Sequence, residues 1–262
     1  ASTSIYGSRG SNGVILVTTK RGTKKSKLKV AINSRLGFNN PNTSFTDDIM
    51  NASQKLDYEA SLGLYDSDAA LLDERRNSGN DINWTDLLVD NEVSQNHDIA
   101  ISGGGKSSSY YSSISYSNVD NIFGSEYERY TVTMRADFEL NKKLKLALSG
   151  NFGNVENQDR RVIGNPFSNA FLLNPWEQVF DDSGNPTRTI SILTGTGGEP
   201  LNPLFVRDNT SIRSVRKNIG GSANLTFKPL EWLTLNGILG ANYNTSKNTN
   251  FENTVVQGGI LS

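Results

Sequence analysis

Apolar and polar residues alternate over much of this chain with a period of two residues. Between Tyr130 and Leu140, apolar side chains occupy every even position and polar or charged side chains every odd position. Such alternation gives a β-strand one apolar and one polar face. The same pattern recurs in six further segments, at residues 28–38, 99–102, 110–117, 144–152, 219–228 and 233–243. It predicts about seven strands, several of which reach the roughly 10 residues that a tilted strand needs to cross a bilayer.

The lengths of the connections between these strands form a second pattern. Short turns are expected at residues 103–108, 141–143 and 229–231, whereas the segments at about 39–95 and 154–216 are long. The connection between the third and fourth strands, of intermediate length, is grouped with the long ones. Outer-membrane barrels have short periplasmic turns and long external loops. The alternation therefore predicts an antiparallel up-and-down sheet with both long segments at the same end.

Helical patterns are found in the first long segment. Apolar residues recur at helical spacing from Ile49 to Leu64, after an expected N-cap at Thr46. A second helix is predicted for residues 67–77, with Gly79 ending it.

The N-terminal part of the chain has a different character. Residues 14–19 are an apolar run followed by two threonines, which predicts a strand buried on both faces. The basic stretch from Lys20 to Lys29 contains no aromatic residue. This composition favours a solvated linker over a nucleic-acid-binding arm, in which aromatic residues would stack on bases.

Composition excludes several classes of function. The 262 residues carry a formal net charge of −1, so the chain has no overall basic field to attract nucleic acid. There is no cysteine, and hence neither a disulfide framework nor a cysteine-based metal site. The sequence contains no apolar run of about 18 residues that would predict a membrane-spanning helix, but a membrane barrel needs only alternation.

Motifs for catalysis or cofactor binding are also missing from the sequence. His97 is the single histidine, so a histidine-based zinc site is excluded. The evenly spaced Gly7, Gly10 and Gly13 precede a predicted strand, whereas a dinucleotide-binding loop precedes a helix. Asp181 and its acidic neighbour lack the spacing of an EF-hand. We expect no enzyme activity, no catalytic residue, no cofactor and no metal site.

Three segments resemble one known family. Residues 5–20, IYGSRGSNGVILVTTK, resemble the end of the plug domain in TonB-dependent outer-membrane transporters of the SusC/RagA type. Residues 124–146 resemble the family's early barrel hairpin, and residues 94–111 resemble its second and third strands. The plug motif comprises Tyr6, Gly7, Arg9, Gly10 and Gly13. Its glycines are expected to permit tight turns, and Arg9 to find a partner in the barrel wall.

This resemblance implies a fold and a division into domains. The fold class is all-β, a partial antiparallel up-and-down transmembrane β-barrel of about seven strands with the C-terminal piece of a plug domain. Residues 1–22 would end the plug, and residues 23–262 would form the N-terminal part of a barrel that has 22 strands in the family. Most of the plug and about two thirds of the barrel would then belong to a longer protein.

The resemblance also implies a function. The protein would import glycans or peptides across the outer membrane of a Gram-negative, Bacteroidetes-like bacterium. Its partners would be a SusD-like surface lipoprotein, the TonB complex and outer-membrane lipid. Two alternatives remain: a siderophore or cobalamin receptor of the same class, or a soluble secreted β-sandwich adhesin or carbohydrate-binding module.

Several aromatic residues are candidates for contacts with ligand or lipid. Trp84 and Trp176 lie in the long segments, where they could stack on a sugar ring or simply pack within a loop. Trp232 follows a short turn, the position expected of a residue at the membrane interface. Tyr130, Phe138 and Phe227 are expected to join Trp232 in an aromatic girdle.

Overall fold

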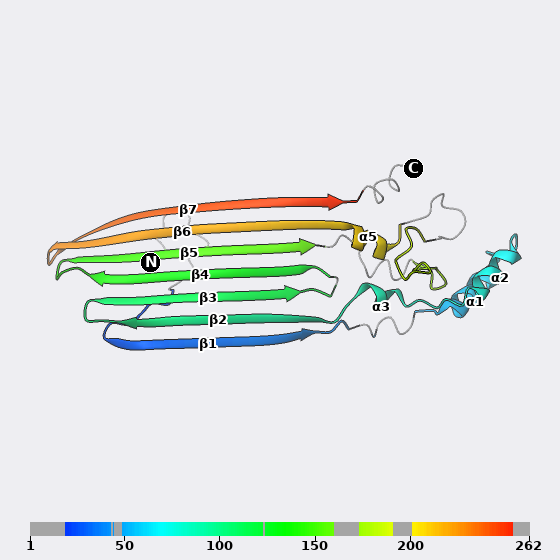
Figure 1. The fold of residues 1–262 in the computed structure, drawn as a ribbon, viewed down its shortest axis with the longest axis horizontal. Helices are drawn as coiled ribbons and strands as arrows, with labels where there is room; N and C mark the ends of the chain where they lie inside the picture. Colours follow the sequence, from blue (N-terminus) through cyan, green and yellow to red (C-terminus); the bar gives the residue numbers. More distant parts are fainter. Residues whose placement is uncertain are drawn as a thin grey trace, which may run out of the picture.

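The computed structural model describes residues 19–42, 44, 49–122, 124–159, 173–190 and 201–253. Residues 14–18 of the predicted strand 14–19, and the plug motif, lie outside these residues. The described part contains one seven-stranded sheet, with strands β1 (Ser26–Asn39), β2 (Glu92–Gly104), β3 (Ser108–Asp120), β4 (Glu126–Glu139), β5 (Leu144–Asp159), β6 (Thr210–Leu230) and β7 (Leu233–Glu252). Each strand pairs antiparallel with the next one along the chain, in the order β1 to β7 (Figure 1). The predicted up-and-down topology is confirmed.

The two ends of the sheet differ as the connection lengths predicted. Short turns join β2 to β3, β4 to β5 and β6 to β7 at one end, and the helices of the long connections lie at the other end (Figure 1). One connection departs from the expectation. β3 and β4 are joined by a tight turn at residues 121–125, in which the Asn121 N–H donates to the Ser125 carbonyl over 2.9 Å.

The strands extend further toward the loops than the apolar alternation indicated. β5 continues to Asp159 and β6 begins at Thr210, although both faces of these end segments are mostly polar. The hydrogen-bonded ladder is nevertheless continuous there, since Asp159 pairs with Ile212 and Thr210 pairs with Glu252. Alternation of apolar and polar residues marks only the part of a strand whose two faces contact different environments. Beyond that part, backbone pairing continues without an apolar signal.

The register aligns the apolar residues of all seven strands on one face. Directly opposed residues in an antiparallel sheet lie on the same side. One row of such residues is apolar across the whole sheet: Ile32, Ile99, Ile114, Val132, Phe152, Ile219 and Tyr243. The adjoining row, on the other face, consists of small and polar residues: Ala31, Ala100, Ser113, Thr133, Asn151, Gly220 and Asn242. The sheet therefore has one apolar and one polar face.

The apolar face is not covered by the parts of the chain that the structure describes. Among the described residues, every buried apolar side chain lies in the segments 52–89 or 175–206, and none lies in a strand. Ile114, in the middle of the sheet, is 58% exposed. A soluble sheet would bury this face against a second layer. Here the hydrophobic core is confined to the loops.

The helices of the long connections are short. They are α1 (Ala52–Ser61), α2 (Ala69–Asn77), α3 (Trp84–Leu88) and α5 (Pro203–Asn209). α1 begins later than predicted, because Asn51 and not Thr46 forms its N-cap, in a capping box with Gln54. α2 agrees with the prediction, with Asp68 as N-cap and Gly79 just beyond its end at φ +71°. α3 and α5 have too few turns to give a helical period in the sequence.

A substitution in the apolar row tests which medium this face contacts. In the longer protein that the resemblance implies, refolded into lipid vesicles, we expect Ile114→Arg to lower the free energy of unfolding by about 2–4 kcal/mol, the cost of a basic side chain near the bilayer midplane. Ile114→Leu serves as the control and should change it little. Urea titration of the refolded protein measures both. If Ile114→Arg left the free energy of unfolding unchanged, as expected at an ordinary water-exposed position, the apolar face would not contact lipid.

Candidate functional site

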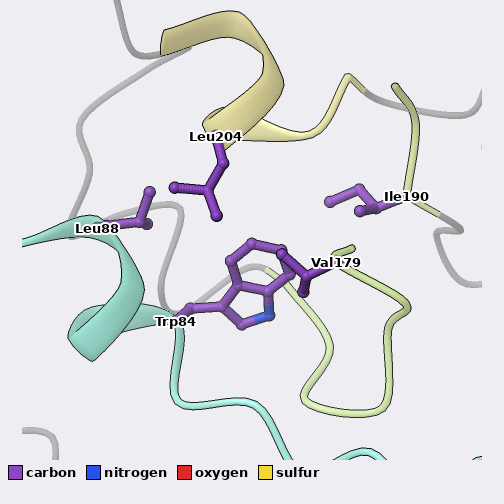
Figure 2. Close-up of a cluster of buried hydrophobic side chains, with 5 residues drawn as sticks. All are labelled: Trp84, Leu88, Val179, Ile190 and Leu204. Atoms are coloured by element: carbon purple, nitrogen blue, oxygen red, sulfur yellow. The ribbon is translucent and has the colours of Figure 1, made fainter. Parts of the chain in front are cut away.

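The two long connections pack together into a single cap at one end of the sheet. Figure 2 shows the centre of the larger core, where the Trp84 indole of α3 packs among Leu88, Val179, Ile190 and Leu204. Trp84 and Leu88 come from the β1–β2 connection, and the other three residues come from the β5–β6 connection. The side chains of one loop thus provide the core of the other.

Hydrogen bonds between the two connections reinforce this packing. The Trp84 Nε1–H donates to the Asn174 carbonyl over 2.9 Å, and the Ile82 N–H donates to the Pro175 carbonyl over 2.7 Å. The side-chain amide of Asn80 donates to the carbonyls of Trp176 and Glu177. Buried backbone carbonyls need such partners in an irregular segment, and here one loop supplies them to the other.

A second core surrounds Trp176, which packs against Ala52, Leu56 and Tyr65. Two cations flank its indole: Lys55 Nζ is 5.3 Å from the ring centroid and Arg75 Cζ is 5.4 Å from it. Such cation–π contacts are strongest where water is excluded.

Buried charges of this core are linked by hydrogen bonds. Arg75 Nη1 donates to the Tyr65 hydroxyl over 2.7 Å, and that hydroxyl donates to Glu59 Oε2 over 2.8 Å. Burial raises the pKa of the Tyr65 phenol, so it remains a donor at neutral pH. Burial also lowers the pKa of the Lys55 ammonium, against the opposing effect of Glu59. Lys55 Nζ donates to Asn174 Oδ1 over 2.6 Å. The chain of bonds compensates charges that would be costly if buried alone.

The two candidate ligand-contacting tryptophans are both buried in this arrangement. Trp84 is 3% exposed and Trp176 is 4% exposed, and Trp84 is also one of the residues that line the cavity described below. Their positions favour the alternative of packing within the loops. The sequence could not distinguish the two roles, because Trp176 is covered by residues of the other connection and Trp84 by residues of both connections.

The cap contains an open cavity that the sequence did not predict. Its volume is about 600 Å³, and it lies between α1 and residues 81–84 and 173–175. Its wall includes exposed apolar side chains, namely Ile49, Met50, Tyr58, Leu62 and Leu64. Lys55, Glu59 and Asp81 supply the charged groups of its lining. Apolar walls with a few polar groups are typical of ligand sites.

Three of the four candidate interfacial aromatics, Tyr130, Phe138 and Phe227, lie on the apolar face, at two levels. Phe138 and Phe227 are near the short turns, and Trp232 lies in the turn between β6 and β7, where it is 80% exposed. Tyr130 is nearer the loops, where its ring lies 4.9 Å from that of Tyr116. The span from Tyr130 to Phe138 is about 27 Å along the strand at about 3.4 Å per residue.

These two levels border the apolar part of the face. The row next to Ile32 on the loop side is polar or aromatic: Ser34, His97, Tyr116, Tyr130, Asn154, Lys217 and Thr245. A barrel strand tilted by about 40° would convert the 27 Å span into about 21 Å of bilayer thickness, near the roughly 25 Å band of known barrels. Tyr130 thus lies at the border opposite to that of the other three aromatics.

The basic segment before β1 lies on the polar face of the sheet. Arg21 Nη1 is 3.2 Å from Asp137 Oδ1 of β4, and Lys24 forms an ion pair with Glu139. β1 itself begins at Ser26, so that Lys27 and Lys29 are strand residues. The segment before β1 therefore ends at Lys25, and it forms ion pairs with the wall while the Arg21 side chain remains 59% exposed. The acidic partners lie more than a hundred residues further along the chain, where spacing gives no hint of them.

Other titratable side chains form hydrogen bonds with neighbouring groups of the same chain. Asp181 Oδ1 accepts the backbone N–H groups of Ser183 and Asn185, each over 2.9 Å, which holds the pKa of its carboxyl below the usual value. His97 shares a hydrogen bond with Ser34 Oγ and stacks on Tyr116. Within the described ranges, no group of acidic or histidine side chains is arranged to hold a metal ion, and no helix is long and apolar enough to cross a membrane.

Comparison with known proteins relates the chain to TonB-dependent receptors. No protein-family model matches the chain. It is 24% identical over 252 residues to TonB-dependent receptor P26 of Formosa agariphila, covering 96% of this chain and 25% of the relative. To TonB-dependent receptor P3 of the same organism it is 33% identical over 151 residues, 57% of this chain and 14% of the relative. The chain thus spans at most about a quarter of the length of these relatives.

Two further similarities, one in sequence and one in fold, concern transporters of the SusC/RagA type. TonB-dependent receptor SusC of Bacteroides thetaiotaomicron is 24% identical over 255 residues, 87% of this chain and 24% of the relative. A chain of the RagAB peptide importer in its open-open state has the same fold, with a TM-score of 0.75 and 20% identity over 95% of this chain and 31% of that one. The chain is thus similar in sequence to TonB-dependent receptors, SusC among them, and shares its fold with a chain of the RagAB importer. These similarities support the SusC/RagA type that the motifs predicted, and with it a location in the outer membrane of a Gram-negative bacterium.

The shared core of the cap can be tested by truncating Trp84. We expect Trp84→Ala to destabilise the cap by about 3–5 kcal/mol, the range for a fully buried aromatic residue. Trypsin should then cleave at Arg75 or Arg76 much faster, while the barrel keeps its resistance to unfolding in cold detergent. Trp232→Ala is the matched control and should leave cleavage of the cap unchanged. Equal cleavage rates in the two variants would show that the loops do not share a core.

Proposed function

We propose that the chain forms part of an active importer: the wall of a TonB-dependent outer-membrane transporter, with its extracellular cap. Residues 1–22 would end the plug, and residues 23–262 would begin the barrel. The observation that supports this most strongly is the apolar row that crosses all seven strands on an uncovered face. The membrane would cover that face, and the polar face would line the lumen.

The position of the N-terminal segment supports the same orientation. Arg21 and Lys24 contact carboxylates that point from β4 to the polar face. A plug that precedes these residues would therefore lie on the lumen side. The polar rows of the sheet, rich in Ser, Thr and Asn, offer the hydrogen-bonding groups that such a plug or a hydrated cargo requires.

We assign the cargo to the glycans or peptides that the resemblance implies, received with a SusD-like surface lipoprotein. The cap supports this role because its cavity of about 600 Å³ lies at the end of the sheet where the long loops gather. The chain would act by binding and positioning cargo, without catalysis, and energy would come from the TonB complex through other parts of the receptor. A soluble adhesin is disfavoured, because it would bury the apolar face of its strands.

Uptake by cells tests this function. We expect a strain that lacks the receptor to lose uptake of a fluorescent oligosaccharide or oligopeptide, and the gene supplied on a plasmid to restore it. A protonophore should abolish the restored uptake, because TonB depends on the proton gradient. Import of ferric siderophore or cobalamin instead would favour the alternative receptor. Unchanged uptake of all these cargoes in the deletion strain would refute the proposal.

A further inference from the structure

The linker, defined as residues 19–25, crosses the polar face of the sheet in steps. The Lys25 N–H donates to the Gly105 carbonyl beside β2 over 2.9 Å, and Gly22 lies over the backbone of Tyr110 in β3. Arg21 then reaches Asp137 in β4. The linker therefore contacts three successive strands on its way from β1 to β4 (Figure 1). Its path is determined by contacts with the wall and not only by its attachment to β1.

Opposite charges meet at the β4 end of this path. Asp137 binds Arg21, and Glu139 binds both Lys24 and Lys145, the latter with 3.0 Å between Nζ and Oε1. Arg135 of the same strand donates to the hydroxyl of Thr19. A single exposed ion pair contributes little, but several charges that share partners contribute more. The side chains of β4 that point to the polar face thus match the basic composition of the linker.

Close backbone contacts provide a second, independent observation. A Cβ atom added to Gly22 would lie 2.6 Å from the Tyr110 backbone nitrogen. A Cβ atom added to Gly104 of β2 would lie 2.5 Å from the Thr23 carbonyl oxygen and 3.1 Å from Lys24 Cα of the linker, and also 2.6 Å from the Ser108 carbonyl oxygen of β3. Real Cβ atoms do not approach so closely, and rigid backbone cannot move aside as a side chain can. One glycine on the linker and one on the wall therefore leave space for the other chain segment.

We propose that Asp137, Glu139 and Gly104 form a wall site that anchors the linker, and that the anchor stays closed while cargo is imported. The inference rests on the proposed function, in which a plug precedes the linker. If that plug moved, the force on the linker would then act on its contacts with β4. The hydrogen bonds between β1 and β2 would not be strained. The recognised partner is a segment of the same chain with two basic side chains and a glycine.

Spin-label mobility tests whether the anchor exists. Thr23→Cys, an exposed site in the linker, is labelled with a nitroxide in the full-length receptor after replacement of any native cysteine elsewhere. We expect one immobilised component in the spectrum. Asp137→Asn with Glu139→Gln should raise the mobile fraction about tenfold, as expected for the loss of an ion-pair network of moderate strength. Gly22→Val should raise it too, because its Cβ would meet the Tyr110 backbone of the wall, a steric route that leaves the charges intact.

A matched control is Asp98→Asn, which removes another carboxylate of the polar face but has no contact with the described part of the linker; it should leave the spectrum unchanged. A mobile label in the parent receptor, or a spectrum insensitive to both the charge and the glycine variants, would overturn the anchor. Migration of unheated samples in a detergent gel verifies that each variant is folded. None of these readouts requires import.

Cross-linking tests whether the anchor stays closed. Lys24→Cys and Glu139→Cys are joined by a short, reducible bis-thiol reagent, and uptake of the fluorescent cargo is compared before and after reduction. We expect equal uptake. Loss of uptake in the bridged receptor, recovered on reduction, would show that the linker must leave the wall and would overturn this part of the proposal. Absence of uptake even in the parent receptor would refute the proposed function, while the spin-label result would still stand.

Discussion

A backbone inside hydrocarbon has no water to bond with, so every peptide group must find its partner within the protein. A sheet of antiparallel neighbours meets this requirement, provided that its strands pair continuously and its outward side chains are apolar. The seven strands meet both conditions, with an unbroken order from β1 to β7 and an apolar row from Ile32 to Tyr243. The sheet thus points its apolar side chains outward, the reverse of a soluble protein, and the remaining features of the chain follow from this orientation.

Because the strands turn their apolar side chains outward, they cannot build a conventional core. The cores form in the loops instead, and each depends on residues from both long connections. Trp84 of the first connection needs Leu204 of the second, and Trp176 of the second needs Leu56 of the first. The polar face keeps its charges accessible, which allows Asp137 and Glu139 to bind the basic linker. Lipid-facing strands, a folded cap and a charged lumen wall are thus linked consequences of one constraint.

The sequence predicted those elements whose signal is local. Alternation located all seven strands, because each side chain responds to the face it occupies, and connection lengths predicted the sidedness of the loops. Capping residues located α2, whereas α1 was placed too early because Thr46 and Asn51 are both acceptable N-caps. The ends of β5 and β6 were missed because both of their faces are polar. The cavity and the ion pairs of Arg21 and Lys24 depend on long-range contacts, for which a single sequence carries no local signal.

A nitroxide scan along β4 of the full-length protein in lipid bilayers tests most directly whether the apolar face contacts lipid, if accessibility to oxygen and to a water-soluble nickel complex is measured at each position. Oxygen concentrates in hydrocarbon and the nickel complex in water. A lipid-facing apolar surface predicts a two-residue oscillation, with oxygen accessibility highest at Val132, Met134 and Ala136 and low at Thr131 and Thr133. Oxygen accessibility that oscillates with the opposite phase, or that is low at the even-numbered residues of β4, would contradict a lipid-facing apolar surface.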